Sequence, residues 1–206
     1  MIDGITTADL GKPDYQLAMK QHGDYIQALE QCGVQVTVLE ADEAYPDSCF
    51  VEDTAVLTRK FALITNPGAP SRKGEIASMI PVIERFYPKE AIEYIQAPGT
   101  LEGGDIMMVG DHFYIGISAR TNREGAQQFI RALEKYGMSG EMVPLHTILH
   151  LKTGLSYIEN NNLLISGEFL DNPTFSQFHH LKVAAGEEYG ANCIWVNGKV
   201  LVPAGY

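Results

Sequence analysis

Hydrophobic side chains recur every three to four residues in four segments of the chain, which is the spacing of one buried helix face. The predicted helices span residues 13–32, 71–87, 123–136 and 174–185. Pro13 opens the first helix and Gly33 follows it, while Asn122 and Gly137 bound the third. Pro81 lies inside the second helix and predicts a kink or an unpaired carbonyl there.

Short runs rich in β-branched and aromatic residues lie between the predicted helices, mostly in pairs joined by turn residues. The predicted strands span residues 34–40, 50–57, 61–65, 93–96, 105–109, 113–117, 154–158, 162–166, 193–196 and 200–204. The hairpins begin near Phe50, Leu101, His150 and Ala191, at steps of 51, 49 and 41 residues. Because units of this size cannot bury their own faces, they pack around a common axis. The pattern predicts an α/β fan or propeller with a central pocket, and an ordinary α/β sandwich with recurring hairpins is the alternative.

The composition favours one compact domain and excludes several classes of partner. The chain has 206 residues, of which 45% are hydrophobic and 20% charged, enough to bury a sizeable core. Its net charge of −11 argues against nucleic acid, whose phosphates require patches of lysine and arginine. The same charge is compatible with a small cationic ligand.

The cysteines and the apolar runs indicate where the protein works. Cys32, Cys49 and Cys193 are far apart and lack the spacing of a disulfide framework or a zinc site. The chain contains no apolar run of bilayer length, and its first residues lack the features of a signal peptide. We therefore expect a cytoplasmic protein with no membrane partner.

Three short strings carry candidate chemistry, and each opens an apolar run: FVEDTAV at 50–56, LEGGD at 101–105 and HLKTG at 150–154. In the first string and just before it, Asp47, Glu52 and Asp53 form an acidic cluster. A carboxylate among apolar residues needs a partner, and a planar guanidinium matches its oxygens two at a time. The alternative is that these acids only bind nearby backbone amides, and spacing alone favours that interpretation.

The other two strings supply a further acid and an imidazole. The glycines after Glu102 let a backbone or a ligand approach closely, although such a sequence is also common in plain loops. His150 lies between two leucines, where it could serve as a general acid or base or be a satisfied core histidine. Arg72 and Arg120 each begin a helical segment and could bind a carboxylate, although exposed arginines usually have no special role. Taken together, these groups predict a receptor for an amino acid with a cationic side chain.

Longer strings then indicate a family. DGITTADLGKPDY, YPDSCFVEDTAV, NPGAPSR, EGGDIMMVGDHFYIG, SARTN, LHLKTGL and ANCIWVN resemble the bacterial dimethylargininases (dimethylarginine dimethylaminohydrolases) of the guanidine-modifying pentein superfamily. The resemblance covers residues 2–206 and implies one domain over residues 1–206. The implied fold is a pentein-type propeller of repeated αββαβ modules in a pseudo-fivefold arrangement. Against that pattern, the first strand and the last module are expected to be missing, which predicts a fragment or a natural truncation.

The resemblance also implies a role for each candidate residue. It makes His150 the general acid and base, and Glu102 the carboxylate that orients and polarises the guanidinium. Asp53 would hold the unsubstituted guanidinium nitrogens, with Glu52 beside it. The remaining contacts would come from Asp47 and the carbonyl of Ile5 to the α-ammonium, from Arg72 and Arg120 to the α-carboxylate, and from Phe50 to the aliphatic stem.

The implied reaction is the hydrolysis of N-omega-methylated arginines, such as asymmetric dimethylarginine and monomethylarginine, to citrulline and the corresponding amine. It passes through a covalent cysteine thiouronium intermediate and uses no metal or organic cofactor. The family's nucleophilic cysteine lies in the last module, so we expect the 206-residue chain to bind methylarginines weakly without turnover. Within the enzyme class, arginine deimination or another guanidine hydrolysis is the alternative. From another class, the alternatives are a non-catalytic binder of arginine derivatives and a module that completes its ring as a homo-oligomer.

Overall fold

The computed structural model describes residues 3–6 and 11–205. In this part of the chain the strands form three three-stranded sheets and one two-stranded hairpin. Each larger sheet begins with an antiparallel hairpin, and its third strand runs parallel to the second. The strands are β1 (Ala55–Leu57), β2 (Ala62–Ile64), β3 (Ile92–Tyr94), β4 (Ile106–Val109), β5 (His112–Ile117), β6 (Ser139–Pro144), β7 (Leu155–Tyr157), β8 (Asn162–Ile165), β9 (His179–Lys182), β10 (Ile194–Val196) and β11 (Lys199–Leu201).

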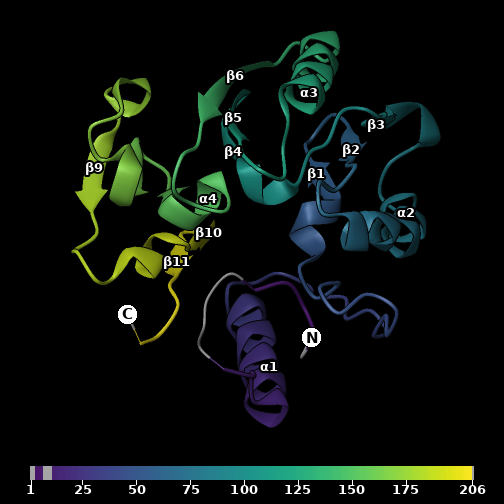
Figure 1. The fold of residues 1–206 in the computed structure, drawn as a ribbon, viewed down its shortest axis with the longest axis horizontal. Helices are drawn as coiled ribbons and strands as arrows, with labels where there is room; N and C mark the ends of the chain where they lie inside the picture. Colours follow the sequence, from purple (N-terminus) through teal and green to yellow (C-terminus); the bar gives the residue numbers. More distant parts are fainter. Residues whose placement is uncertain (1–2, 7–10, 206) are drawn as a thin grey trace.

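The sheets follow one another in an arc (Figure 1). The first strands of successive sheets adjoin, since β7 contacts both β4 and β10. The helices α2 (Ile76–Ile83) and α3 (Arg123–Lys135) lie on the outer side of the arc, and α1 (Tyr15–Gln31) lies apart from the sheets. The hairpins therefore recur in space as well as in sequence. The segments that lead into their first strands lie toward the inside of the arc.

Two of the predicted helices are confirmed together with their caps. The side chain of Asp14 accepts hydrogen bonds from the second and third residues of α1, and Gly33 follows the helix with a φ of +82°. Asn122 caps α3 by accepting from the N–H of Gly125. Both helices end within one residue of the predicted bound.

The second predicted helix is split. Residues 70–75 form the 3₁₀ helix η2 (Pro70–Glu75), and the α-helix begins only at Ile76. Proline at the first position of η2 suits a helix start because its missing N–H would have no partner there. Pro81 lies inside α2, which ends two residues later, at Ile83.

The prediction of a helix at residues 174–185 is wrong. This segment holds the end of the 3₁₀ helix η6 (Pro173–Phe175) and then strand β9, which pairs with β8. Phe175 and Phe178 share helical spacing because both face the core from a turn, where Phe178 N–H bonds the carbonyl of Phe175. The histidines at 179 and 180 are accordingly on a strand and not on a helix.

Three strand predictions also need correction. Residues 34–40 form no strand, because their alternating valines have no neighbouring strand to pair with among the described residues. Residues 51–54 form the 3₁₀ helix η1 (Val51–Thr54), and the strand begins only at Ala55. Strand β6 was not predicted, because its glycine, glutamate and proline are poor strand formers; its pairing with β5 imposes the conformation.

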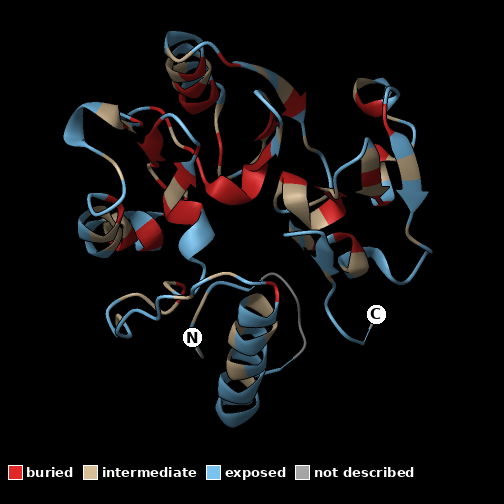
Figure 2. Ribbon diagram, turned by 180° about the vertical axis from the view of Figure 1, so that it is seen from behind, coloured by how far each residue is buried: buried red, intermediate tan, exposed pale blue. Residues whose placement is uncertain are grey.

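The core lies between neighbouring sheets. One cluster joins the first two sheets to α3 through Phe61, Leu101, Phe113, Phe129 and Leu133, all of them fully buried. A second cluster joins the second and third sheets through Leu151, Leu155, Phe169 and Phe175. Figure 2 shows the buried residues concentrated along the arc, whereas α1 has none. None of the described helices combines the length and the hydropathy needed to cross a membrane.

Candidate active site

The three strings identified in the sequence meet at one point. The 3₁₀ helix η4 (Gly103–Asp105) contacts both η1 and the short helix α4 (Leu151–Gly154), which begins directly after His150. One polar side-chain atom from each of Asp53, Glu102 and His150 lies within 4.8 Å of the other two. The prediction that these side chains converge is therefore confirmed, although short helices and not strands carry them.

Glu102 occupies the centre of the cluster and is fully buried. Its Oε1 accepts hydrogen bonds from the backbone N–H groups of Gly68 (3.0 Å) and Ala69 (3.2 Å). Its Oε2 lies 2.9 Å from His150 Nε2 and 3.1 Å from Arg120 Nη1. Burial alone would raise the pKa of Glu102, but these donors and the charge of Arg120 lower it to about 2. The carboxylate is therefore ionised and fixed in orientation at neutral pH.

His150 faces this carboxylate and rests on the backbone of η4. Because Glu102 is ionised and can only accept, His150 Nε2 must carry a proton and donate it. Burial alone would lower the pKa of His150, but the bond to Glu102 and the charges of Asp105 and Asp53 raise it above 6.5. A Cβ on Gly104 would lie 2.9 Å from His150 Cγ, so only glycine leaves room for the ring. The close approach expected at the paired glycines is confirmed at this position.

Asp53 is the second buried acid of the site. Its Oδ1 accepts from the N–H of Gly104 at 2.8 Å, and its Oδ2 accepts from Arg72 Nη1 at 2.6 Å. Arg72 is 3% exposed and also donates to Glu75, through Nε at 3.0 Å and Nη2 at 2.8 Å, and to two backbone carbonyls. Burial alone would lower the pKa of Arg72, but the bonds to Glu75 and Asp53 raise it. Arg72 thus neutralises the acids, and its contact with a substrate carboxylate stays a prediction.

Arg120 approaches the same acid from the loop after β5. Its Nη1 donates to both oxygens of Glu102, at 3.3 and 3.1 Å, and its side chain is 13% exposed. Arg120 therefore lies between the buried acid and the surface. Its predicted contact with a carboxylate is untested by this arrangement.

The other predicted contacts lie at the rim. Asp47 is buried and accepts from the N–H of Ile5 at 3.0 and 3.2 Å, so these two residues are brought together, although through the N–H of Ile5. Phe50 is 59% exposed, and the centroid of its ring lies 5.8 Å from Cζ of the Arg72 guanidinium. Glu52 forms an ion pair with Lys152, which connects η1 to α4. The roles of these four predicted residues in ligand binding stay predictions.

Several residues of the site were missed. Glu75 orients Arg72 from three residues away in the same 3₁₀ helix, and Lys152 pairs with Glu52. Asp105 and Ser118 are bonded to each other beneath the site. The i,i+3 spacing of Arg72 and Glu75 was a usable signal, and Asp105 ends the string LEGGD that was already of interest. No spacing rule pointed to Ser118.

A hollow of about 550 Å³ lies among the hairpins, but Asp53, Glu102 and His150 do not line it, so the central pocket around these three groups stays a prediction. Its walls include side chains of β1, β4, β7 and β10, the first strands of the four hairpins. Gly103, Glu52 and Lys152 line it as well, so the hollow adjoins the site where the Glu52–Lys152 ion pair lies. The recurring hairpins therefore enclose one shared space.

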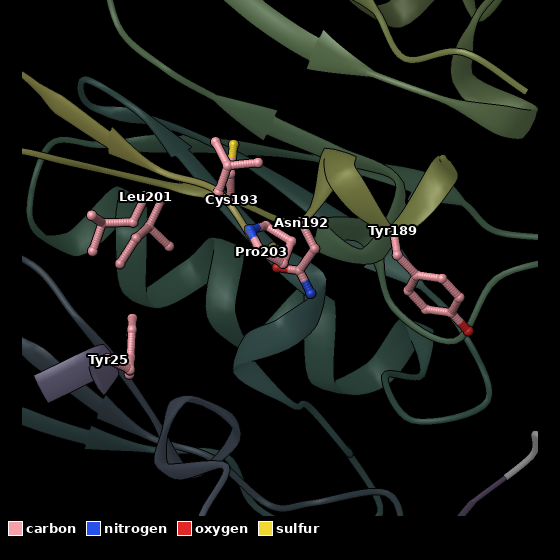
Figure 3. Close-up of a pocket in the computed structure, with 8 residues that line it drawn as sticks. Tyr25, Tyr189, Asn192, Cys193, Leu201 and Pro203 are labelled. Carbon is pink, nitrogen blue, oxygen red and sulfur yellow. The ribbon is translucent and has the colours of Figure 1, made fainter. Parts of the chain in front are cut away.

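The three cysteines do not join the acid and histidine cluster. No cysteine sulfur of the described chain lies within 4.8 Å of all three groups of the cluster. Cys193 is buried and lines both the hollow described above and a second one, of about 350 Å³, between α1 and the β10–β11 hairpin (Figure 3). Cys49 is exposed because it lies in a turn before η1. Burial raises the pKa of the Cys193 thiol, which disfavours the reactive thiolate.

Comparison with known proteins connects this geometry to a family. Residues 11–171 match the family model described as N,N dimethylarginine dimethylhydrolase, eukaryotic. The chain is 56% identical over 206 residues to the N(G),N(G)-dimethylarginine dimethylaminohydrolase of Pseudomonas aeruginosa, covering 100% of this chain and 81% of that protein. It is 34% identical over 201 residues to the protein of the same name from Streptomyces coelicolor, covering 97% and 76%.

Solved structures agree. A cysteine-to-serine variant of the Pseudomonas aeruginosa enzyme, in complex with citrulline, matches with a TM-score of 0.98 at 56% identity, covering 100% of this chain and 80% of that one. A dimethylarginine dimethylaminohydrolase whose histidine is replaced by glycine, an adduct with S-methyl-L-thiocitrulline, matches with a TM-score of 0.97 and the same identity and coverage. At 15% identity, the N-terminal domain of a cyanobacterial arginine dihydrolase shares the fold, with a TM-score of 0.80 over 93% of this chain and 74% of that one.

The fold is that of the guanidine-modifying pentein superfamily, an α/β class. Within it, the chain belongs to the dimethylarginine dimethylaminohydrolase family.

Proposed function

We propose that this protein acts on N-omega-methylated arginines and that its buried acids and histidine form the guanidinium-binding part of the site. The convergence of Asp53, Glu102 and His150 within 4.8 Å carries the proposal. Around them, the carboxylates of Asp47, Asp53, Glu75 and Glu102 outnumber the two arginines, so the site retains negative charge for a cationic ligand. The P. aeruginosa relative, which is a dimethylarginine dimethylaminohydrolase, supports this choice of substrate.

The acids would hold the planar cation through its N–H groups. Carboxylate oxygens accept hydrogen bonds two at a time from a guanidinium, and Glu102 and Asp53 are both held rigidly by backbone donors. Glu102 would orient and polarise the guanidinium, and Asp53 would bind the unsubstituted nitrogens, with Glu52 beside it. Such fixed charges stabilise a transition state without reorganising during the reaction.

His150 would move the protons. Its Nε2 carries a proton and its pKa lies above the ordinary value, so it can protonate a departing amine near neutral pH. In the proposed reaction a thiolate attacks the guanidinium carbon, the methylated amine leaves with the proton of His150, and water then attacks the thiouronium carbon. The neutral imidazole takes a proton from that water, and citrulline and the thiol are released.

The rim residues would bind the amino-acid end of the substrate. Arg120 would supply donors for the α-carboxylate, and the buried Arg72 would do so by exchanging one of its present bonds. Asp47 and the carbonyl of Ile5 would supply acceptors for the α-ammonium. Phe50 would cover the aliphatic stem. No metal is required, because the oxygens whose spacing would suit a cation already face the positive charges of Arg72 and Arg120.

The thiol is the part that the cluster lacks. The solved relatives include a cysteine-to-serine variant bound to citrulline and an adduct with a thiocitrulline, which supports covalent cysteine chemistry in the family. Cys32, Cys49 and Cys193 do not lie at the cluster. We therefore propose that the 206-residue chain binds methylarginines weakly and does not hydrolyse them.

Its three free cysteines are also consistent with a cytoplasmic location.

Calorimetry of the chain with asymmetric dimethylarginine tests the binding half of the proposal. We expect weak, saturable binding that is lost in Glu102→Gln and kept in the control Glu134→Gln, since Glu134 is exposed on α3. Absence of binding by the unmodified chain would overturn the proposal. Release of citrulline and dimethylamine would instead overturn the statement about the thiol, and release of citrulline and ammonia from arginine would indicate an arginine deiminase.

A further inference from the structure

Asp105 is a fully buried carboxylate that the proposed reaction does not use. It ends η4, two residues beyond Gly103, and bonds in two directions: toward Leu151, and toward the loop of Arg120, where the side chain of Thr121 donates to it as well as that of Ser118. Its Oδ1 accepts from the backbone N–H of Leu151 at 3.0 Å, and its Oδ2 accepts from the hydroxyl of Ser118 at 2.7 Å. A Cβ on Gly116 would lie 2.9 Å from Oδ1, so glycine on the neighbouring strand leaves space for this carboxylate.

Each of the two bonds leads to one partner of Glu102. Leu151 directly follows His150, so the first bond fixes the backbone that carries the imidazole. The Ser118 hydroxyl accepts the backbone N–H groups of Arg120 at 2.9 Å and Thr121 at 3.1 Å, so the second bond fixes the loop that carries the guanidinium. One buried side chain is thus connected to both groups that contact Glu102 Oε2.

The pattern of donors requires a carboxylate at this position. The Ser118 oxygen already accepts two N–H groups, so its own proton must go to an acceptor, and the N–H of Leu151 also needs one. Both oxygens of a carboxylate can accept these two hydrogen bonds. An amide has only one oxygen, so in either orientation its NH₂ group would face the Ser118 hydroxyl or the Leu151 N–H. A buried donor without an acceptor is strongly disfavoured.

We propose that Asp105 is a positioning residue that holds His150 and Arg120 in place against Glu102. The inference rests on the proposed function only in taking these three groups as parts of the ligand site. The Asp105 carboxylate touches neither the ligand position nor the Glu102 carboxylate in this scheme, although the Asp105 backbone N–H donates to the carbonyl of Glu102 at 3.1 Å. It acts through the backbone of Leu151 and the hydroxyls of Ser118 and Thr121.

The first test is Asp105→Asn, with Asp111→Asn as its matched control in the exposed β4–β5 turn. The readout is the titration of the His150 ring protons by NMR in the full chain without ligand. The charged groups that face His150 are Glu102, Asp105 and Asp53, with Arg120 behind Glu102. Removing one of the three carboxylates should lower the titration midpoint of His150 by about one pH unit. The control should leave it unchanged. In Asp105→Asn the loss of charge lowers the midpoint by itself, and loss of the contact that holds His150 against Glu102 lowers it further.

The second test is Ser118→Ala, which removes the hydroxyl that joins Asp105 to the backbone N–H groups of Arg120 and Thr121. It keeps the charge of Asp105, its bond from the Thr121 side chain and its bond toward His150. We expect the His150 midpoint to stay within about 0.3 units, because charge and backbone contact are retained. Affinity for asymmetric dimethylarginine should fall severalfold, and by about tenfold or more in Asp105→Asn, where both connections are lost. Comparing the two variants separates the connection toward His150 from the connection toward Arg120.

The proposal is overturned if Asp105→Asn has the same His150 titration midpoint as the Asp111→Asn control and binds the ligand with an affinity within twofold of that control. If circular dichroism shows that Asp105→Asn does not fold, the test rests on Ser118→Ala. An unchanged affinity of that variant for asymmetric dimethylarginine also overturns the proposal. If the unmodified chain binds no ligand, the proposed function fails, but the His150 titration still tests the positioning role. The two failures are therefore distinguishable.

Discussion

The sheets that carry the site differ sharply from the ends of the chain. Around the second sheet, Phe113, Phe129 and Leu133 are fully buried, and α3 packs against the sheet along one continuous face. By contrast, α1 has no buried residue, and its Leu17 is 51% exposed. The β10–β11 hairpin is similar, since Trp195 is 40% exposed and β11 has no third strand beside it in the described chain.

This difference shows which part of the molecule preorganises the site. Asp53, Glu102 and His150 belong to the packed sheets, and within residues 3–6 and 11–205 every buried side-chain nitrogen or oxygen has a hydrogen-bond partner. Local stability follows buried contacts, so the arc should open last and α1 first. The ends can therefore change with little effect on the acids, whereas changes beneath the acids should propagate.

The largest effect should come from Phe129→Ala in α3. The phenylalanine is fully buried and packs edge-on against Phe113 at 5.5 Å, so truncation leaves a cavity costing about 3–5 kcal/mol. The matched change in the exposed helix, Leu17→Ala, should cost less than about 1 kcal/mol because half of the side chain is already in water. Urea unfolding followed by circular dichroism measures both. Equal costs would contradict the contrast between the two regions.

Acid should weaken the packed region through Glu102. Its folded pKa is about 2, below the ordinary 4.5, so the ionised form stabilises the fold. That stabilisation is present above about pH 4.5 and is lost as the pH falls toward 2, amounting to at most about 3 kcal/mol. Glu102→Gln should remove this part of the pH dependence, so that variant and unmodified chain converge in stability at low pH.

Urea unfolding at several pH values between 7 and 3 checks this prediction. Glu134→Gln on the exposed face of α3 is the control and should reproduce the pH dependence of the unmodified chain. A stability difference between Glu102→Gln and the unmodified chain that stays constant with pH would contradict the assignment of the lowered pKa to Glu102.

The convergence of the site could be predicted because it follows from a repeat. Side chains at the start of successive hairpins meet when the hairpins pack around one space, so the positions of Asp53, Glu102 and His150 in the sequence sufficed. The local structure that carries them was not predictable in the same way. Residues 51–54 were predicted as part of a strand with the apolar residues around them, yet they form a 3₁₀ turn that places Asp53 against the N–H of Gly104.

The remaining errors have a common cause, namely partners distant in sequence. Phe175 and Phe178 have helical spacing, but the open edge of β8 recruits the residues that follow as β9. Residues 34–40 have strand composition, but no strand lies beside them in the described part of the chain. The ion pair of Arg72 with Asp53 likewise depends on the fold of η2. Propensity alone does not contain these pairings.

Gly104→Ala should disturb the site directly while leaving the ends unchanged. The new Cβ would lie 2.9 Å from His150 Cγ and 3.0 Å from Asp53 Oδ1, so the ring must shift away from Glu102. Overpacking of this kind costs about 1–3 kcal/mol. We expect a clear loss of affinity for asymmetric dimethylarginine and a lower His150 midpoint, because the bond to Glu102 that raises the pKa of His150 is weakened.

Calorimetry and NMR titration of the Gly104→Ala variant measure these two effects. Gly110→Ala in the β4–β5 turn is not a suitable control, because its φ of +61° strains any side chain. Gly23→Ala in α1 is better, since a Cβ there meets no atom within 4 Å. Alanine at that helix position should stabilise slightly and leave His150 unchanged; a shifted His150 midpoint would mean that α1 is coupled to the site after all.

The smallest expected effect is that of Asp14→Ala at the start of α1. The Asp14 carboxylate accepts from the N–H groups of Gln16 at 2.9 Å and Leu17 at 3.1 Å, and its removal leaves both donors to water, which costs about 1 kcal/mol of helix stability. Because α1 buries no residue against the sheets, this cost should appear as local fraying, seen as faster amide hydrogen exchange within α1. Exchange rates in α3 and the affinity for asymmetric dimethylarginine should not change. If α3 amides lose protection together with those of α1, the two regions unfold as one unit and the contrast drawn from burial is wrong.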